Sequence, residues 1–173
     1  MDSCRLEPYK KTYYYEYEKE RILTFMQTET IPIKKLHKDA IIPTYGTEFS
    51  AGADLYACIE HTISIAPQET ILIPTGIALE IPVGYVGLIY ARSGLATKRG
   101  IAPANKVSVI DSDYRGELMI PLHNHSTIPE EIAPKERIAQ IIFTPYRKGI
   151  FQETDELNHT NRETGGFGST GKF

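Results

Sequence analysis

A glycine-rich stretch near the C-terminus, Arg162–Gly171, has residue types suited to a phosphorylated ligand. Glycines let backbone N–H groups approach an anion closely, and successive N–H groups in a turn form an anion-binding nest. Ser169 and Thr170 add hydroxyl donors, and Arg162 offers a fixed fork of N–H groups for phosphate oxygens. Phe167 lies between glycines and presents a flat face on which a nucleobase can stack. The stretch therefore predicts a nucleotide-binding arm.

This stretch has two other interpretations. Chain ends rich in glycine and serine are commonly flexible tails without a binding role, and the composition alone leaves that alternative open. A P-loop is the second alternative, because Gly166–Lys172 fits the spacing G-x-x-x-x-G-K. The next residue is Phe173 rather than Ser or Thr, so the hydroxyl that a P-loop needs for magnesium is missing. We therefore reject the P-loop.

A second candidate segment, Val109–Glu117, lies between two predicted strands and is expected to form the loop of a hairpin. Turn chemistry accounts for Ser112, Asp113 and Gly116 without any function. It does not account for Asp111, which directly follows an apolar pair. An aspartate is ionised at neutral pH and can accept a proton from an attacking water, so Asp111 is the candidate general base.

Two further segments combine small residues with one chemically useful group. Ala51–Ala57 places Asp54 in an apolar stretch, where it is either a turn or cap residue or a magnesium ligand. Ala91–Ala96 follows a predicted strand and opens a short predicted helix. Ser93 and Gly94 at this helix start are expected either to contact phosphate or to provide an ordinary serine N-cap.

Composition limits the class of protein. With 173 residues the chain is long enough for one domain with a sizeable core, and its net charge of −3 provides no field that attracts nucleic acid or an acidic membrane. No apolar run approaches the ~20 residues of a membrane-spanning helix, and no signal peptide is recognisable. Cys4 and Cys58 are too few for a disulfide framework. We expect a soluble, cytoplasmic protein.

The elements that must position these groups are predicted to be strands. Long amphipathic periods are absent after residue 30, and the plausible helix is a turn or two at Gly94–Lys98. Many short β-branched runs separated by Pro and Gly predict an all-β sandwich or barrel. Residues 1–30 mix tyrosines with both charge signs and are compatible with an amphipathic helix, an added strand or a disordered arm. The expected strands lie at Ile31–Ile33, Thr62–Ile65, Thr70–Ile73, Gly76–Pro82, Val86–Tyr90, Lys106–Ile110, Leu118–Leu122 and Arg137–Phe143.

Taken in order, the candidate segments resemble the five motifs of the trimeric dUTP diphosphatase (dUTPase) family. The resemblance covers about residues 31–173 and leaves the first thirty residues outside it. The third and fifth segments are the most specific. The matching segments are Ala51–Ala57, Ala91–Ala96, Asn105–Met119, Arg137–Gln140 and Arg162–Gly171.

The resemblance implies a β-clip or jelly-roll core at 31–159, an N-terminal extension at 1–30 and a flexible glycine-rich arm at 160–173. It implies a homotrimer whose subunits share their active sites. It also implies Mg²⁺-assisted hydrolysis of dUTP to dUMP and pyrophosphate, which limits uracil incorporation into DNA and supplies dUMP for dTMP synthesis. No nucleic acid or membrane partner is expected.

Individual roles are also implied by this resemblance. Asp111 matches the base that deprotonates the water attacking the α-phosphorus, Asp54 matches the acid that holds magnesium through water, and Tyr114 matches the ring that packs on the deoxyribose. The remaining matches are phosphate contacts at Arg92, Ser93, Gly94 and Gln140, the base-holding hairpin with Asn105, Val109, Ile110 and Met119, and the arm with Arg162, Phe167, Gly168, Ser169 and Thr170.

Three residues depart from the family pattern. Ser108 stands where most members have Gly, Ala91 replaces a common Pro, and Glu163 replaces the common Gly after Arg162. Two alternative functions remain open at this point. One is a dCTP deaminase-like enzyme of the same fold, which needs a glutamate that acts on cytosine and has a different tail. The other is a catalytically silent nucleotide-sensing module, which has no need of Asp111.

Overall fold

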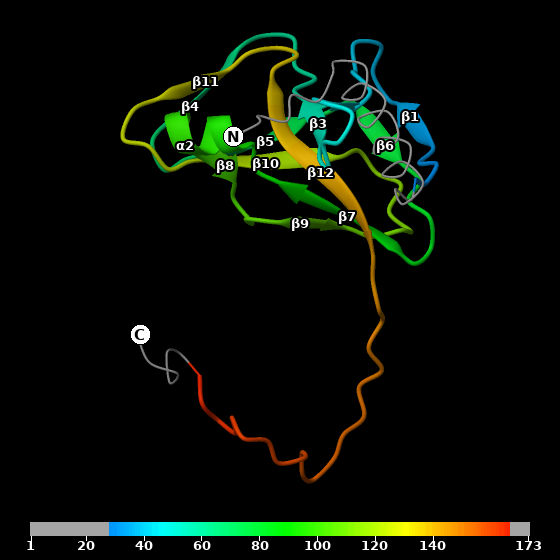
Figure 1. Cartoon of the computed structure of the whole chain (residues 1–173). Coiled ribbons are helices and arrows are strands. Elements are labelled where there is room, and N and C mark those ends of the chain that lie inside the picture. The colour runs from blue at the N-terminus through cyan, green and yellow to red at the C-terminus, as the bar shows by residue number, and fades with distance from the viewer. Residues whose placement is uncertain (1–27, 167–173) are drawn as a thin grey trace, which may run out of the picture.

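In the part of the chain that the structure describes, short antiparallel strands and one short helix make up the body (Figure 1). The structure is a computed structural model, and it describes residues 28–166. The all-β class predicted from the sequence is confirmed. The elements are β1 (Ile33–Lys35), β2 (Thr44–Tyr45), β3 (Ala53–Tyr56), β4 (Ile63–Ile65), β5 (Thr70–Pro74), β6 (Ile77–Leu79), β7 (Tyr85–Tyr90), α2 (Ser93–Arg99), β8 (Ile101–Pro103), β9 (Ser108–Ile110), β10 (Met119–Asn124), β11 (Glu130–Ile132) and β12 (Arg137–Pro145).

The strands form four small sheets in which all described pairs are antiparallel. The largest has five strands in the order β2-β3-β12-β7-β9, and a three-stranded sheet has the order β5-β10-β8. The pairs β1-β6 and β11-β4 complete the set. Sheets packed in this way fit the expected jelly-roll or β-clip fold, in which non-sequential strands are neighbours.

Side chains that alternate between buried and more exposed positions along the strands build the core. In β10 the burial alternates residue by residue, so that Ile120, Leu122 and Asn124 point inward. Most of the other fully buried large side chains are isoleucines, whose branched Cβ suits a pleated surface. Asn124 is the polar exception, and its amide donates to the carbonyls of Ile65 (2.9 Å) and Ile128 (2.8 Å). Burial of this amide is therefore offset by hydrogen bonds.

Helix α2 confirms the helix predicted at Gly94–Lys98 and is one residue longer at each end. Its N-cap is Arg92, without a side-chain capping bond, so the ordinary serine N-cap considered for Ser93 is wrong. The Ser93 hydroxyl is in the first helical turn instead. Gly100 ends the helix with φ +67°, a conformation that suits glycine. Arg99 then ties this end to Glu130 (2.7 Å) and Glu136 (2.6 Å).

The predicted hairpin around Asp111 is wrong. Strand β9 pairs with β7, whereas β10 pairs with β5 and β8, so residues 111–118 cross from one sheet to another. Turn residues predict that a chain reverses, but tertiary packing decides with which strand it pairs. The sequence also missed four short strands, namely β2, β3, β8 and β11, because they are two to four residues long and lack a β-branched run.

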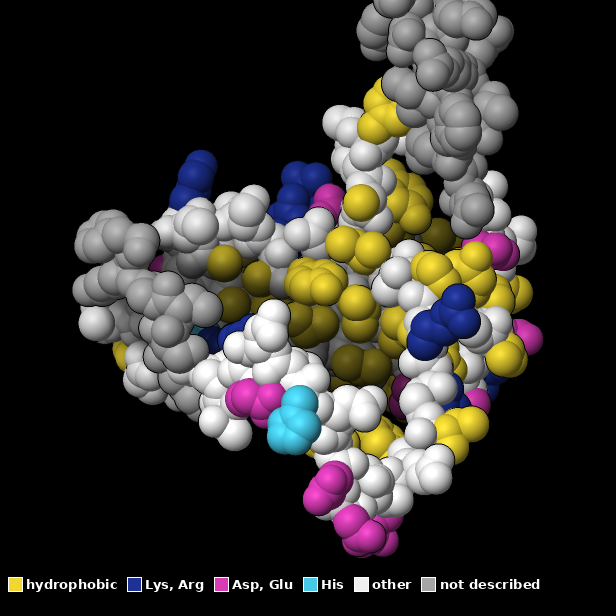
Figure 2. Space-filling view, turned by 60° about the horizontal axis from the view of Figure 1, so that its bottom comes forward, with side chains coloured by type: hydrophobic (Ala, Val, Ile, Leu, Met, Phe, Trp, Pro, Cys, Tyr) yellow, Lys and Arg dark blue, Asp and Glu magenta, His cyan; other side chains and the backbone are white. Residues whose placement is uncertain are grey.

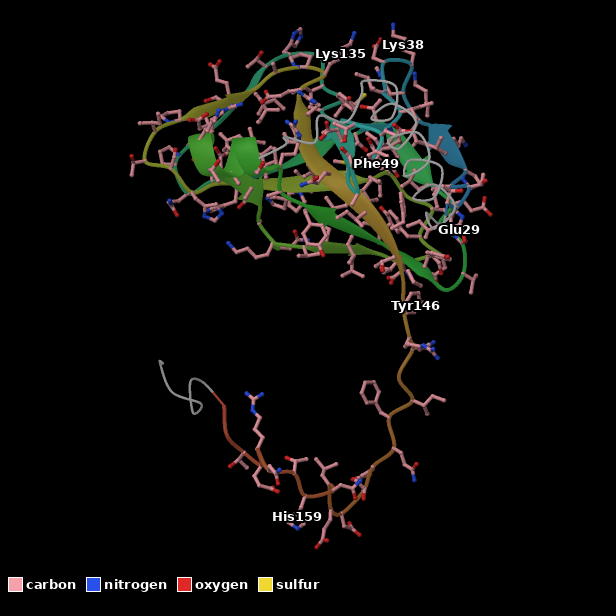
Figure 3. All side chains as sticks on the ribbon, viewed as in Figure 1. Glu29, Lys38, Phe49, Lys135, Tyr146 and His159 are labelled. Atoms are coloured by element: carbon pink, nitrogen blue, oxygen red, sulfur yellow. The ribbon has the colours of Figure 1, made fainter. Side chains whose placement is uncertain are left out.

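Beyond Pro145 the chain leaves the body and runs away from it as an extended arm (Figure 1). Figure 3 labels Tyr146 at its root and His159 far from the body. The Ile150 and Phe151 side chains are 96% and 101% exposed. The division at residue 159 stays a prediction, although the last described strand ends at Pro145. None of the helices in residues 28–166 is long and apolar enough to cross a membrane.

Candidate active site

A cavity of about 410 Å³ brings together three of the predicted motifs. Five of the predicted site residues line it, contributed by the first, second and fourth motifs. Gly46, Ser50, Ala51, Gly52 and Arg137 line the same cavity. The five predicted residues are Asp54, Arg92, Ser93, Gly94 and Gln140.

The register of the five-stranded sheet explains why these segments meet. Strand β12 lies between β3 and β7, and Gln140 is opposite both Asp54 on β3 and Tyr90 on β7. Arg92 follows two residues after Tyr90. Residues that are far apart in the sequence therefore form one row across the sheet, and this row ends at the first turn of α2.

Asp54 is the electrostatic centre of the cavity. It is buried, with 7% of its surface exposed, and lies in a strand rather than at a turn or cap. Its Oδ1 accepts from Arg92 Nε at 2.7 Å, and its Oδ2 accepts from Arg137 Nη1 at 3.1 Å. Arg92 also donates to the Arg137 carbonyl at 3.2 Å. Two guanidinium groups share one carboxylate, so the cluster keeps a net positive charge and suits an anion.

Arg137 is a functional candidate that the sequence reasoning missed. The sequence marks it only as the first residue of the Arg137–Gln140 motif and predicts no role for its side chain. The signal was its position in that motif, three residues before a predicted phosphate contact. Its side chain is 51% exposed, so the part not bonded to Asp54 is accessible from the cavity.

Gln140 is held in place by two neighbours. Its Nε2 donates to the Ala91 carbonyl at 2.9 Å. Gly52 packs so closely that a Cβ at this position would clash with the Gln140 side-chain amide. Ala91 contributes its backbone oxygen here, so this interaction does not depend on the side chain that departs from the family pattern.

A second group of predicted residues surrounds the Asp111 loop. Asp111 is exposed, and its carbonyl accepts from the Tyr114 N–H at 3.2 Å. The Tyr114 hydroxyl donates to the Glu117 carbonyl at 2.9 Å. A Cβ on Gly116 would clash with the Tyr114 ring, so glycine allows the ring to fold back over the loop. Glu117 fixes the end of this loop by accepting from the Gly76 N–H at 2.7 Å.

The remaining residues of this group flank the loop. Asn105 lies in the turn before β9, and Ser108, the first residue of β9, is buried with 8% exposed. Ser108 is not among the described residues with positive φ, so a side chain is accommodated there without backbone strain. Val109 is 61% exposed, whereas Ile110 packs against the core and Met119 begins β10.

The two groups do not meet within one chain. Ile110 is opposite Gly87 on β7, and Arg92 lies five residues farther along the same direction. At about 3.3 Å per residue, the backbone at Ile110 and the backbone at Arg92 are about 16 Å apart. Since β9 and β7 are antiparallel, the chain at Asp111 is directed away from Arg92.

The arm is described only in part. Arg162 Nε donates to the Gly165 carbonyl at 2.8 Å, and Glu163 has φ +42°, a conformation favoured by the glycine that is common at this position. Phe167, Gly168, Ser169 and Thr170 lie outside the described residues. Residues 28–166 contain no cluster of three or more His, Cys, Asp or Glu side chains that could hold a metal by themselves.

Comparisons with known proteins show the family of the chain. The family model described as dUTPase matches residues 38–171. The deoxyuridine 5'-triphosphate nucleotidohydrolase of Nautilia profundicola is 50% identical over 142 residues, 82% of this chain and 99% of the relative. The enzyme of the same name from Syntrophotalea carbinolica is 44% identical over 146 residues, 84% of this chain and 99% of the relative.

Solved structures are similar as well. A variant of the Staphylococcus bacteriophage 80alpha dUTPase with dUpNHpp has a TM-score of 0.72 and 27% identity. Another variant of the phage 80alpha dUTPase has a TM-score of 0.75 and 28% identity. Each similarity covers 83% of this chain and 99% of the other chain.

Proposed function

This chain belongs to the dUTPase family, and from that premise we propose how its residues carry out the reaction. The protein is a dUTP diphosphatase, which hydrolyses dUTP to dUMP and pyrophosphate. Asp111 accepts a proton from a water molecule whose oxygen attacks the α-phosphorus. The new O–P bond forms as the bond from the α-phosphorus to the bridging oxygen breaks, and pyrophosphate leaves with that oxygen.

The arginine cluster supports a triphosphate site. Arg92 and Arg137 leave a net positive charge after they share Asp54, and the cavity of about 410 Å³ is lined by Ser93, Gly94 and Gln140 as further polar partners. Each bond from an arginine to a phosphate oxygen is charge-assisted, about twice as strong as a neutral hydrogen bond. The position of Arg92 is fixed by two hydrogen bonds before substrate arrives, so little side-chain freedom is lost on binding.

We assign the uracil base to the second group of residues, which surrounds the Asp111 loop. Uracil presents acceptor, donor and acceptor along its pairing edge, and the backbone and Asn105 amide beside β9 supply groups that complement it. Cytosine reverses two of the three positions and leaves buried groups unpaired, at about 1–3 kcal/mol for each. The Tyr114 ring, held by Glu117 and Gly116, packs on the deoxyribose, where a ribose hydroxyl has no room.

The residues of the cavity fit magnesium bound through water. A carboxylate has about four acceptor positions, and Asp54 uses two of them for its arginines. Mg²⁺ retains several water ligands and is commonly held by one carboxylate together with substrate phosphates. Asp54 is the residue that would hold it, and the ion would neutralise charge on the phosphates during hydrolysis. An intracellular, cytoplasmic location remains a prediction from the sequence.

A homotrimer would unite the two groups of residues. Within one chain the backbone at Asp111 lies more than about 16 Å from that at Arg92, which is too far for both residues to act on one α-phosphate. Closed threefold symmetry lets the base-binding group of one subunit face the phosphate cavity of the next. Hydrophobic side chains also gather in a band across the underside of the body, as expected for an assembling surface (Figure 2).

The arm completes the proposed site. It is the C-terminal segment that leaves the body after Pro145, and its glycine-rich end carries Arg162, Phe167, Gly168, Ser169 and Thr170. We assign Arg162, Ser169 and Thr170 to the γ-phosphate, and Phe167 to the face of the uracil. Closure of such a segment excludes water other than the nucleophile.

The observation that carries this proposal is the convergence of Asp54, Arg92, Arg137 and Gln140 in one cavity of a chain that matches the dUTPase model. The test is the rate of pyrophosphate release from dUTP, dCTP, dTTP and UTP in the presence of magnesium. We expect dUTP to be hydrolysed at least about 100-fold more efficiently than each of the others. Ammonia release from dCTP would favour a deaminase, and tight dUTP binding without turnover would favour a sensing module.

A further inference from the structure

We propose that the Ser108 hydroxyl is a positioning group that holds the Asn105 amide ready for the base. This inference rests on the proposed function, because it takes Asn105 to contact uracil. It concerns one of the residues in which this chain departs from the family pattern. A glycine at this position has no side chain with which to hold Asn105.

The Ser108 side chain is bonded to the turn that precedes its own strand. Ser108 Oγ lies 2.9 Å from Asn105 Nδ2, which donates to it, and 3.2 Å from Asn105 Oδ1, to which it donates. One hydroxyl therefore spans both polar atoms of the same amide. Ser108 is 8% exposed, so the bonds are largely protected from competing water, whereas Asn105 itself is exposed.

The backbone of the turn supports the same arrangement. The Lys106 N–H donates to the Pro103 carbonyl at 3.0 Å, and the Val107 N–H donates to the Asn105 carbonyl at 2.7 Å. Lys106 has φ +64°, which tightens the chain between Asn105 and Ser108. These bonds fix the Asn105 backbone but leave its side chain free to change rotamer. The Ser108 hydroxyl removes that remaining freedom.

A side chain that is already in its bound rotamer loses less entropy when the ligand arrives. Ser108 should therefore raise the affinity for ligands that carry the uracil base and leave the affinity for ligands without a base unchanged. If Ser108 instead served only the stability of β9, its replacement would weaken the binding of both kinds of ligand or lower the melting temperature.

The experiment compares binding of dUMP and of inorganic tripolyphosphate, which has no base, to the full chain. The proteins are wild type, Ser108→Ala, Ser108→Thr, Asn105→Ala and the double variant Ser108→Ala/Asn105→Ala. Ser64→Ala in β4 is the matched control, because it removes an exposed strand hydroxyl outside both groups of site residues. We expect Ser108→Ala to weaken dUMP about three- to tenfold, as for loss of one or two neutral hydrogen bonds.

Tripolyphosphate affinity and melting temperature should stay at the wild-type values in Ser108→Ala, and Ser108→Thr should restore dUMP binding. The double variant should bind dUMP like Asn105→Ala alone, because the hydroxyl acts only through the amide. Additive losses, or equal weakening of tripolyphosphate, would overturn the role of Ser108 while wild-type dUTP turnover still supports the proposed function. A wild-type protein that neither binds dUMP nor hydrolyses dUTP would overturn both.

Discussion

Asp111 is an exposed carboxylate at the end of a strand, on a loop that is fixed at both sides. The Asp111 carbonyl accepts from Tyr114, and Glu117 ties the end of the loop to Gly76. A general base must be positioned before its charge is useful. The loop supplies that position through its backbone, so the carboxylate can change without loss of the fold.

Asp111→Asn is expected to keep folding and dUMP binding but to lower kcat by about 100-fold or more, because the shape remains while the proton acceptor is lost. The measurement is steady-state pyrophosphate release, with the melting temperature and dUMP affinity determined on the same sample. A kcat close to that of the wild type would remove Asp111 from the role of base.

Glu163 shows how the chain tolerates a departure from its family. Its φ of +42° suits glycine, yet its carboxylate accepts from the Thr160 N–H at 2.7 Å and lies 3.4 Å from His159. The local hydrogen bond offsets part of the cost of a side chain at this conformation.

Among the elements, the alignment of β3, β12 and β7 creates the cavity around Asp54, to which we assign the phosphates. Gln140 on β12 is opposite Asp54 on β3 and opposite Tyr90 on β7, and the Arg92 segment follows directly after Tyr90. A shift of the register by one residue would turn the side chains of a strand to the other face, so this row depends on the strand pairing described here.

Gly52→Ala tests this row. The added Cβ would clash with the Gln140 amide, whose side chain must shift, and we expect the shift to weaken its bond to the Ala91 carbonyl. Overpacking of this kind costs about 1–3 kcal/mol, so kcat/KM for dUTP should fall about tenfold. Gly149→Ala is the control, because nothing lies within 4 Å of its Cβ position. Equal activity of the two variants would show that Gln140 placement does not limit the reaction.

The arm is expected to matter for turnover and hardly at all for stability. Ile150 and Phe151 are fully exposed and do not pack into the core. The described residues beyond Pro145 form no strand. Deletion of Arg162–Phe173 should therefore leave the melting temperature within about 2 °C of the wild type, because surface segments contribute little to unfolding.

In the same truncated protein, dUTP turnover should collapse, whereas affinity for dUMP, which lacks the γ-phosphate, should change little. Calorimetry, dUMP binding and kcat on one preparation separate these effects. Survival of kcat would contradict the assignment of the arm as a closing segment, and unfolding of the protein would contradict its independence from the core.

At the scale of the whole molecule, the separation of the two site groups predicts a shared active site. Asp111→Asn and Arg92→Met subunits should each be inactive as pure oligomers. When they are unfolded together and refolded at equal ratio, about a quarter of the sites should draw an intact Asp111 and an intact Arg92 from different subunits.

Recovery of about a quarter of the wild-type activity after refolding, and none after simple addition of folded proteins, is the expected result. Light scattering should give the mass of three chains for the wild type. An active monomer at assay concentration would contradict the proposal, and so would mixed oligomers that stay inactive.

The sequence alone was enough to predict the all-β class, the helix after Arg92 and five of the residues that line the cavity around Asp54. β-Branched runs between Pro and Gly are local signals, and they mark strands such as β7 and β12 wherever these strands pair. The five motifs were enough to name the candidate site residues, because the chemistry depends on the type and spacing of the side chains.

Only the tertiary structure decided how these residues are partnered. Asp54 lies between Arg92 and Arg137 because β12 separates β3 from β7, and no local pattern encodes which strands become neighbours. The expected hairpin failed for the same reason, since β10 lies between β5 and β8, where Ile120 and Leu122 are buried in the core, and does not pair with β9. Strand pairing is a long-range choice made by packing of the core, and the distance between Asp111 and the arginines follows from it.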